Sequence, residues 1–257
     1  MTSEATQTKS SGAGATIVQP VTQAGACWSC GAAAGGGHFC AACGKIQPLN
    51  SVSDSGDADY FAFFGLPRKL TIEADTLERK FHSLSWKLHP DNFVRASEYE
   101  RSLSLERSSQ LNDAFRTLRE PVSRLEYLLE ISGARSEDQH KQQAPPELLA
   151  EVFELNESLD ELREARQAGG DTVVMAEIGR HLNAARADFE EKLGEVDSEI
   201  GALFAEWDRL VDAGSDGESA DGGAAKQKLF ARMNEALNRR SYIRNLVQGV
   251  QKELAEA

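Results

Sequence analysis

Apolar residues recur every three to four positions along most of this chain, and this spacing is the feature that most constrains its fold. Residues spaced in this way lie on one side of a helix. Leu77, Phe81 and Leu84 illustrate the pattern, and the later stretches that repeat it are rich in Leu and Ala. Runs of β-branched residues, which favour strands, are few. The spacing therefore predicts an all-α protein.

Polar, Gly-rich and Pro-containing stretches interrupt this pattern and divide the chain. Residues 1–24 are rich in Ser, Thr, Gly and Ala, so they bury too little apolar surface to offset the entropy of ordering. The stretches QPLNSVSDSGD and GARSEDQHKQQAPP have the composition of linkers. The expected organisation is a disordered tail at 1–24, a four-cysteine knuckle at 25–46, a linker at 47–57, a helical hairpin domain at 58–133, a linker at 134–146 and a helical domain at 147–257.

The region 58–133 is expected to form a helical hairpin. A short apolar cluster, YFAFFGL, predicts a brief helix at its start. The next helix carries Arg79, Lys80 and Lys87 away from its apolar stripe, so it has a basic face. Pro90 interrupts this helix because proline lacks a backbone donor, and the apolar pattern then resumes until Pro121. Two antiparallel helices joined by a short polar loop are predicted.

The region 147–257 holds three amphipathic segments. Pro145 and Pro146 can open the first helix. Gly169 and Gly170 separate the first segment from the second, and the polar stretch AGSDGESADGG separates the second from the third. These features predict an antiparallel three-helix bundle.

All four cysteines of the chain lie close together, in the pattern C-x2-C-x9-C-x2-C. Two such knuckles can bring four thiolates to one tetrahedral zinc ion, at about 2.3 Å. A shell of four thiolates leaves no open position for water or substrate, so the pattern predicts a structural site. The intervening GAAAGGGHF offers almost no apolar core, and the metal is expected to supply most of the folding free energy. The expected ligands are Cys27, Cys30, Cys40 and Cys43.

Other interpretations of this segment stay open. Disulfides or free thiols are the alternatives to zinc, although a cytosolic chain keeps its thiols reduced and paired knuckles are rare by chance. His38 is an alternative ligand, and Trp28 either packs over the small metal core or anchors a partner. Because the linker at 47–57 follows, we expect it to isolate the metal site, so that removal of the site leaves the helical domains folded.

Charge and motif content argue against several classes of function. The net charge of −13 opposes binding to nucleic acid, which depends on Lys and Arg neutralising phosphates. No apolar run approaches the roughly 20 residues that span a bilayer, and the N-terminus lacks a hydrophobic signal core. We therefore expect a cytoplasmic protein with no membrane partner. Motifs of zinc proteases, serine hydrolases and P-loop enzymes are also missing from the sequence, so we expect no enzymatic activity.

The chain also resembles a known family, over residues 59–257. The motifs that carry the resemblance are DYF at 59–61, FGLP at 64–67, LHPDNF at 88–93, RLEYLL at 124–129 and ELNESLDEL at 154–162. Together they resemble the J-domain, and more closely its HscB branch of iron–sulfur co-chaperones, some of which carry a four-cysteine knuckle in front. The region 58–133 would then be the J-domain, and 147–257 the domain that binds the client.

This resemblance implies a co-chaperone and not an enzyme. Such a protein delivers an iron–sulfur cluster scaffold protein to a DnaK-type, HscA-like chaperone and stimulates the ATPase of that chaperone. Opposite charge would steer the encounter with the chaperone and make it sensitive to salt. By resemblance, the residues that engage the chaperone are His89, Pro90 and Asp91, and the positive docking face is formed by Arg79, Lys80 and Lys87.

The resemblance also implies a scaffold-binding face on the first helix of the C-terminal domain. Leu149, Phe153 and Glu157 follow each other at i, i+4 steps, as residues on one face do. The face that meets the bundle is expected to hold Val152, Leu155, Leu159 and Leu162, and the scaffold-binding residues are Leu149, Ala150, Phe153, Glu154 and Glu157.

The last helix departs from the family pattern. Family members often carry an aromatic residue near the scaffold surface, where this chain reads NRRSY. Either Arg239 replaces that aromatic residue or Tyr242 reaches the same place.

Rival functions come from the same class and from others. A general J-domain protein that delivers unfolded chains is one rival, but its Gly/Phe-rich linker and β-rich client domain are missing from this sequence. A cysteine-based redox or metal protein is another, which oxidation-dependent disulfide formation would favour. A nucleic-acid-binding zinc module is disfavoured by the acidic charge.

Overall fold

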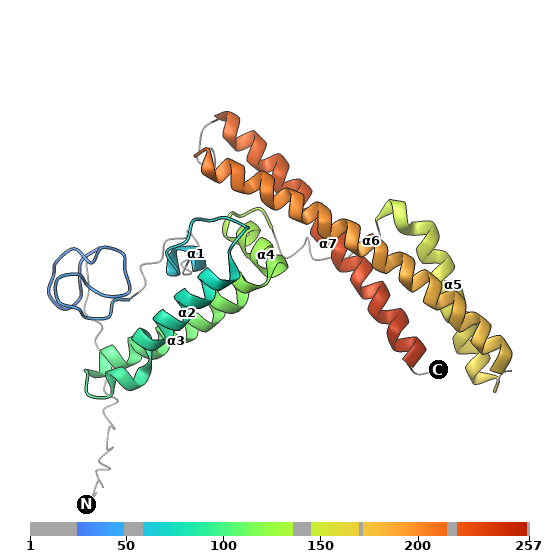
Figure 1. Ribbon diagram of the computed structural model, residues 1–257, viewed down its shortest axis with the longest axis horizontal. Helices are drawn as coiled ribbons and strands as arrows, with labels where there is room; N and C mark the ends of the chain where they lie inside the picture. The colour runs from blue at the N-terminus through green and yellow to red at the C-terminus, as the bar shows by residue number, and fades with distance from the viewer. Residues whose placement is uncertain (1–24, 49–58, 136–144, 170–171, 215–219, 256–257) are drawn as a thin grey trace, which may run out of the picture. The chain divides into compact units, whose positions relative to one another are not determined.

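The computed structural model of the chain describes residues 25–48, 59–135, 145–169, 172–214 and 220–255 (Figure 1). The predicted tail at 1–24 and most of the two predicted linkers lie outside these ranges. Within the described ranges every regular element is a helix, and the only bridges of β type are the isolated pairs Ala26–Ala33 and Phe39–Ile46. The prediction of an all-α fold is confirmed.

Contacts divide the chain into two compact units. The first unit comprises Met1–Asn50 and Leu88–Ser108, and the second comprises Ser51–Lys87 and Ser109–Ala257. This grouping divides two helices, at 87/88 and at 108/109, so the domain boundaries expected from the sequence stay a prediction. None of the helices in the described ranges combines the length and apolarity that a bilayer span requires.

The hairpin predicted around Pro90 is present. Its helices are α1 (Tyr60–Phe63), α2 (Ala74–Leu88), the 3-10 turn η1 (Pro90–Phe93), α3 (Glu98–Arg119) and α4 (Pro121–Ile131). Asp59 caps α1, because its Oδ1 accepts hydrogen bonds from the amides of Phe61 and Ala62 at 2.9 and 3.3 Å. The same carboxylate pairs with Arg68 at 2.8 Å. These contacts explain why an aspartate begins the DYF motif.

Aromatic and aliphatic side chains hold α2, the later part of α3, and α4 together in the second unit. Phe81 of α2 stacks on Phe115 of α3 with ring centroids 4.2 Å apart. Arg124 of the RLEYLL motif is buried and donates to the carbonyl oxygens of Leu118, at 2.6 Å, and Leu70. A guanidinium whose donors meet backbone carbonyls can be buried without leaving its polar atoms unpaired. The fully buried leucines of this core include Leu70, Leu77, Leu111, Leu118, Leu125, Leu128 and Leu129.

Three long helices form the C-terminal part of the second unit, as predicted. They are α5 (Leu149–Gln167), α6 (Thr172–Asp212) and α7 (Ala220–Ala255), and a short turn, η3 (Pro146–Leu148), precedes α5. Helix α6 packs against both α5 and α7 (Figure 1). The buried positions recur along each helix, and on α6 they include Leu182, Phe189, Val196, Ile200, Leu203 and Trp207.

The end of α6 is also bound to the loop between α1 and α2. Asp208 accepts hydrogen bonds from the amides of Leu70 and Thr71, at 2.7 and 2.9 Å. Trp207 Nε1 donates to the carbonyl oxygen of Arg68 at 2.7 Å. The hairpin helices of the second unit and the C-terminal bundle are therefore joined by specific polar contacts, which the sequence did not predict.

Candidate metal site and partner-binding surfaces

The four cysteines lie together in the first unit. Their sulfur atoms are all within 4.8 Å of one another. The Sγ atoms of Cys27 and Cys43 are 3.6 Å apart, and those of Cys30 and Cys40 are 3.8 Å apart. A tetrahedral site with Zn–S bonds of about 2.3 Å has sulfur–sulfur edges of about 3.8 Å, whereas a disulfide measures about 2 Å. The thiols therefore fit a tetrahedral metal ion and are not paired as disulfides.

The backbone repeats the same turn at each cysteine pair. The amide of Gly31 donates to the carbonyl of Cys27 at 3.0 Å, and the amide of Gly44 donates to the carbonyl of Cys40 at 2.9 Å. Both glycines have a φ near +70°, which residues with a side chain rarely adopt. The turns direct both cysteines of a pair toward one point, as two metal knuckles require.

The neighbouring thiols differ in how readily they ionise. Burial raises the pKa of Cys27, but amide donors at Cys30 and Ser29 and the thiols of Cys43 and Cys40 outweigh this effect and lower it to about 6. The amide of Lys45 favours the Cys43 thiolate, yet desolvation and the other three thiols raise the pKa of Cys43 to about 12. Proximity of the sulfur atoms thus favours one thiolate at the expense of another, a cost that a bound cation would offset.

Trp28 and His38, whose roles the sequence left open, both have partners other than the cysteine thiols. Trp28 Nε1 donates to the carbonyl of Ile46 at 2.6 Å, and its ring meets that of Tyr99 edge-on at 4.8 Å. His38 Nδ1 lies 3.2 Å from a guanidinium nitrogen of Arg107. Both Tyr99 and Arg107 belong to α3, so the expectation that a linker isolates the cysteine segment is wrong.

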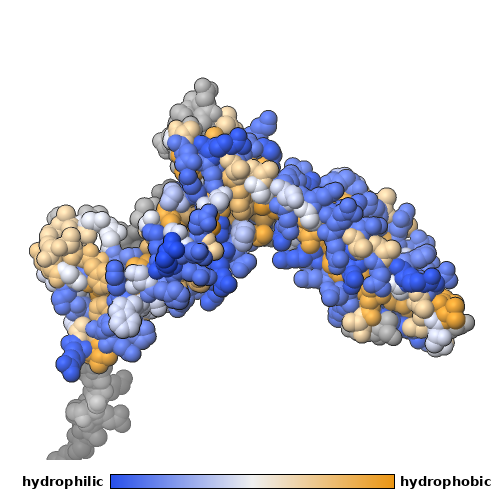
Figure 2. Space-filling view, viewed as in Figure 1, coloured by the Kyte–Doolittle hydropathy of each residue, from blue (hydrophilic) through white to orange (hydrophobic). Residues whose placement is uncertain are grey.

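The surface of the cysteine segment is neither strongly polar nor strongly apolar. In Figure 2 it forms the pale area at the left, as its content of Gly and Ala predicts. Its buried residues are few, and apart from Ile46 and Gln47 they are small, namely Cys27, Ala34 and Cys40. A core of this size gives the segment little stability of its own.

His89, Pro90 and Asp91 form an exposed turn between α2 and α3. His89 caps this turn, because its Nδ1 accepts from the amide of Asp91 at 3.3 Å when the ring is neutral. A protonated ring would instead pair with the Asp91 carboxylate, 3.5 Å away. The carbonyl of Leu88, just before the turn, accepts hydrogen bonds from Ser104 and Ser108 at 2.7 and 3.0 Å. The turn is thus anchored at its base while its polar side chains face outward.

The three basic residues expected to dock the chaperone differ in their surroundings. Arg79 and Lys87 are exposed on α2. Lys80 is half-buried, and its Nζ donates to the carbonyl of Phe64 at 2.9 Å. Lys80 therefore also ties α2 to α1, a structural role that the sequence did not suggest.

Three large apolar side chains of the hairpin region are exposed. The sequence did not predict their exposure. They are Trp86 on α2, Val94 after the His89 turn and Leu105 on α3. None of the three belongs to the apolar pattern that predicted the hairpin helices, and the structure shows that each is exposed.

The residues expected to bind the scaffold form one exposed stripe on α5. Phe153 is 70% exposed and Leu149 is 54% exposed. Ala150, Glu154 and Glu157 are exposed beside them. On the other side of α5, Val152, Leu155 and Leu162 are buried and Leu159 is half-buried, as expected.

Arg239 of α7 lies between two acidic residues instead of packing as an aromatic residue would. Its guanidinium pairs with Glu199 of α6 and, at 3.7 Å, with Glu147 of the η3 turn. Glu147 comes two residues before Leu149 in the chain. Arg239 therefore ties α7 to the start of α5. Tyr242, the other residue considered for the place of the aromatic residue, is half-buried.

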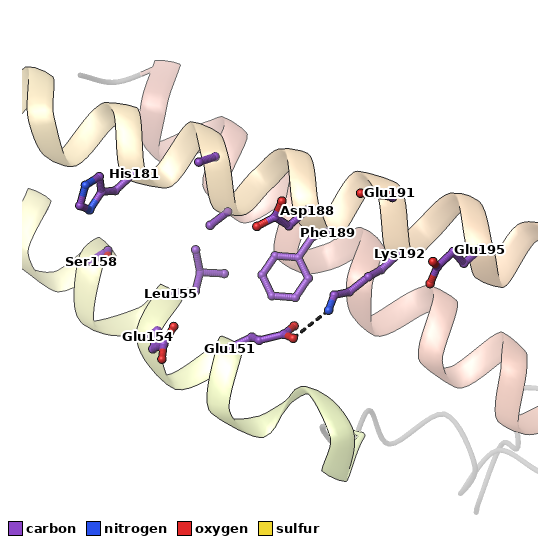
Figure 3. Close-up of a pocket in the computed structure, with 12 residues that line it drawn as sticks. Glu151, Glu154, Leu155, Ser158, His181, Asp188, Phe189, Glu191, Lys192 and Glu195 are labelled. Atoms are coloured by element: carbon purple, nitrogen blue, oxygen red, sulfur yellow. Dashed lines mark hydrogen bonds and ion pairs between the residues drawn. The ribbon is translucent and has the colours of Figure 1, made fainter.

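A groove of about 610 Å³ runs between α5 and α6 (Figure 3). Leu155 and Phe189 form its apolar floor, and Lys192 pairs with Glu151 at 2.8 Å across it. The remaining charged groups at its edge are acidic, and the carboxylate of Glu154 belongs to both the groove and the exposed stripe. The acidic residues that α6 contributes are Asp188, Glu191 and Glu195.

Comparison with known proteins finds clear relatives, although no family model matches the chain. A protein of Vibrio vulnificus (strain YJ016), named co-chaperone protein HscB homolog, is 34% identical over 143 residues, which cover 54% of this chain and 81% of the relative. A homolog of Azoarcus sp. (strain BH72) with the same name is 31% identical over 138 residues, 54% of this chain and 78% of the relative. The iron-sulfur cluster co-chaperone protein HscB homolog of Arabidopsis thaliana is 35% identical over 167 residues, 65% of this chain and 58% of the relative.

A solved structure shares the fold. The crystal structure of human co-chaperone protein HscB aligns with a TM-score of 0.53 and 24% identity, over 88% of this chain and 96% of the human chain.

Proposed function

Since the chain belongs to the HscB co-chaperone family, we propose that it brings an iron–sulfur cluster scaffold protein to a DnaK-type, HscA-like chaperone and stimulates the ATPase of that chaperone. The observation that carries this proposal is the turn formed by His89, Pro90 and Asp91. Its base is fixed by two serine hydroxyls at the Leu88 carbonyl, and its histidine and aspartate face outward. A rigid, exposed turn of this kind suits recognition by a partner, because little entropy is lost on binding.

The chaperone would meet this turn together with the basic residues of α2. Arg79 and Lys87 have free access to an acidic partner surface, whereas Lys80 contributes its charge from a fixed position. Attraction between opposite charges speeds encounter and weakens as salt rises. The protein itself performs no chemistry in this scheme, and the ATP is hydrolysed by the chaperone.

The scaffold would bind the exposed stripe on α5. Phe153 and Leu149 offer apolar surface that helix α5 does not need for its own packing, since Val152 and Leu155 already face the bundle. An exposed aromatic residue with carboxylates beside it is typical of a binding hot spot with a polar rim. Glu154 and Glu157 would then select a scaffold surface with basic residues.

The cysteine site is proposed to hold zinc as a structural ion. Four thiolates with sulfur–sulfur distances near those of a tetrahedron favour zinc over harder ions such as Mg²⁺ or Ca²⁺. When bound, the ion supplies the cross-links that the small core of the segment lacks. We place this function in a cytoplasm, where thiols stay reduced and available to the metal.

The test is reconstitution with purified partners from the same cell. Single-turnover ATP hydrolysis by the DnaK-type chaperone is measured alone, with this protein, with the scaffold, and with both. We expect this protein to accelerate hydrolysis and the scaffold to increase the effect further. Equal stimulation by an unfolded polypeptide and by the scaffold would instead indicate a general J-domain protein. No stimulation by the metal-loaded protein would disprove the proposal.

A further inference from the structure

Three side chains of the cysteine segment contact the first half of α3. They are Trp28, His38 and Lys45, and each lies close to a cysteine in the sequence. Trp28 follows Cys27 directly, His38 precedes Cys40 by two residues, and Lys45 follows Cys43 by two residues. The backbone turn that orients each cysteine therefore also positions the contacting residue beside it.

The contact made by Lys45 ends on the residue that caps α3. Its Nζ lies 2.8 Å from a carboxylate oxygen of Glu100, which is only 5% exposed. Glu100 also accepts from the amide and the hydroxyl of Ser97, at 3.3 and 3.0 Å, in a capping box at the start of the helix. Desolvation opposes ionisation of Glu100, but hydrogen bonds from Lys45 and Ser97 outweigh it and lower its pKa. The lysine thus partners a buried charge, and removing only one partner of such a pair is costly.

The other two contacts lie on the same stretch of α3. Trp28 meets the ring of Tyr99, and His38 lies beside Arg107, which is 1% exposed. Burial lowers the pKa of Arg107 to about 10, because a desolvated guanidinium holds its charge less well. The cysteine segment therefore contacts α3 at two places. The first is the start of the helix, at Tyr99 and Glu100, and the second is Arg107, two turns further along.

The same two turns of α3 hold the base of the chaperone-binding turn. Ser104 and Ser108 donate to the carbonyl of Leu88, the residue before His89. These serines lie between and just after the residues that contact the cysteine segment. Any movement of this part of α3 would therefore shift the anchor of the turn.

We propose that the four-cysteine segment is a metal-dependent brace, in which Trp28, His38 and Lys45 hold the first half of α3 and so fix His89, Pro90 and Asp91 in the arrangement that the chaperone binds. The segment has too small a core to keep these three side chains in place without the metal. Loss of the metal would release the brace, so chaperone recruitment would depend on the metal content of the cell. This inference rests on the proposed function, because it assumes that the His89 turn binds the chaperone.

The test compares full-length variants by hydrogen exchange and by chaperone binding. Lys45→Met removes the ion pair and keeps all four thiols, Cys40→Ser removes a metal ligand, and Lys228→Met removes an exposed lysine of α7 as a control. We expect Cys40→Ser to speed exchange of amides in 99–108 by about tenfold or more, and Lys45→Met to speed it severalfold with zinc content unchanged. The chaperone concentration for half-maximal stimulation should rise in the same order, and Lys228→Met should match the native protein.

Two outcomes would overturn the brace, and a separate variant tests the proposed function. Unchanged exchange in 99–108 after loss of the metal, while amides of 25–48 exchange freely, would overturn the brace. Faster exchange together with an unaltered chaperone requirement would also overturn it, because the turn would then not depend on α3. The variant His89→Gln tests the function separately, since it should abolish stimulation without changing exchange in α3.

Discussion

Asp208 accepts a hydrogen bond from the backbone amide of Leu70 at 2.7 Å, across 138 positions of the chain. With the amide of Thr71 on its other oxygen, one carboxylate fixes the loop between α1 and α2 to the end of α6. We expect Asp208→Ala to lower the free energy of unfolding by about 2 kcal/mol, because two backbone donors lose their acceptor. Urea unfolding followed by circular dichroism measures this. Asp212→Ala is the matched control, since Asp212 is 65% exposed and its pair with Lys69 should contribute less than about 1 kcal/mol.

The metal site predicts a defined zinc content. Protein produced in medium with zinc should contain one zinc ion per chain, and Cys40→Ser should lose it, because three thiolates hold the ion far less tightly. Elemental analysis of the reduced protein is the measurement. The helices α5, α6 and α7 should keep their circular dichroism, since they share a core of their own. A native protein with no zinc, or one that contains disulfides when isolated under reducing conditions, would contradict the assignment.

The turn before α3 predicts a loss of activity without a loss of fold. His89→Gln and Asp91→Asn should each reduce stimulation of the chaperone ATPase to the level of the chaperone alone, because both side chains face outward from an anchored turn. Their melting temperatures should stay within about 2 °C of the native value, as is usual for exposed positions. Ser104→Ala is an informative companion, since it keeps both residues but removes one hydrogen bond from the Leu88 carbonyl. Native stimulation by His89→Gln would show that the chaperone binds elsewhere.

The exposed stripe on α5 predicts separate effects on binding and stability. Phe153→Ala should weaken scaffold binding at least tenfold, about 1.4 kcal/mol, and should leave the melting temperature nearly unchanged because Phe153 is largely exposed. Leu155→Ala is the control on the opposite side, where loss of a buried leucine should cost about 2–5 kcal/mol of unfolding free energy. Titration calorimetry and thermal unfolding give the two quantities. Normal scaffold binding by Phe153→Ala would remove the proposed face from α5.

Features set by short spacing were accessible from the sequence. The cysteine pairs, the interruption at Pro90 and the i, i+4 stripe on α5 each depend on residues within a few positions of one another. The same local patterns predicted the helices of the C-terminal bundle. These predictions were correct because hydrophobic periodicity and turn geometry depend only on residues within one helix or turn.

Contacts between distant segments were not accessible in this way. Asp208 and Glu100 look like ordinary polar residues on helices, and only the fold brings them to Leu70 and Lys45. Lys45 stood before a predicted linker, so nothing in its neighbourhood suggested a partner 55 positions away. Arg124 lies in the RLEYLL motif, but hydrophobic periodicity does not predict that an arginine is buried among backbone carbonyls.

Because α6 is long, the hydrogen bonds that hold its end also affect where its other end lies. A continuous helix of 41 residues is about 60 Å long, and α5 packs along the half that is far from Asp208. If a helix of this length turned as a rigid body by about 5° at the anchored end, its far end would move by about 5 Å. If α5 binds the scaffold as proposed, the hydrogen bonds of Trp207 and Asp208 would fix the direction in which the bound scaffold is held.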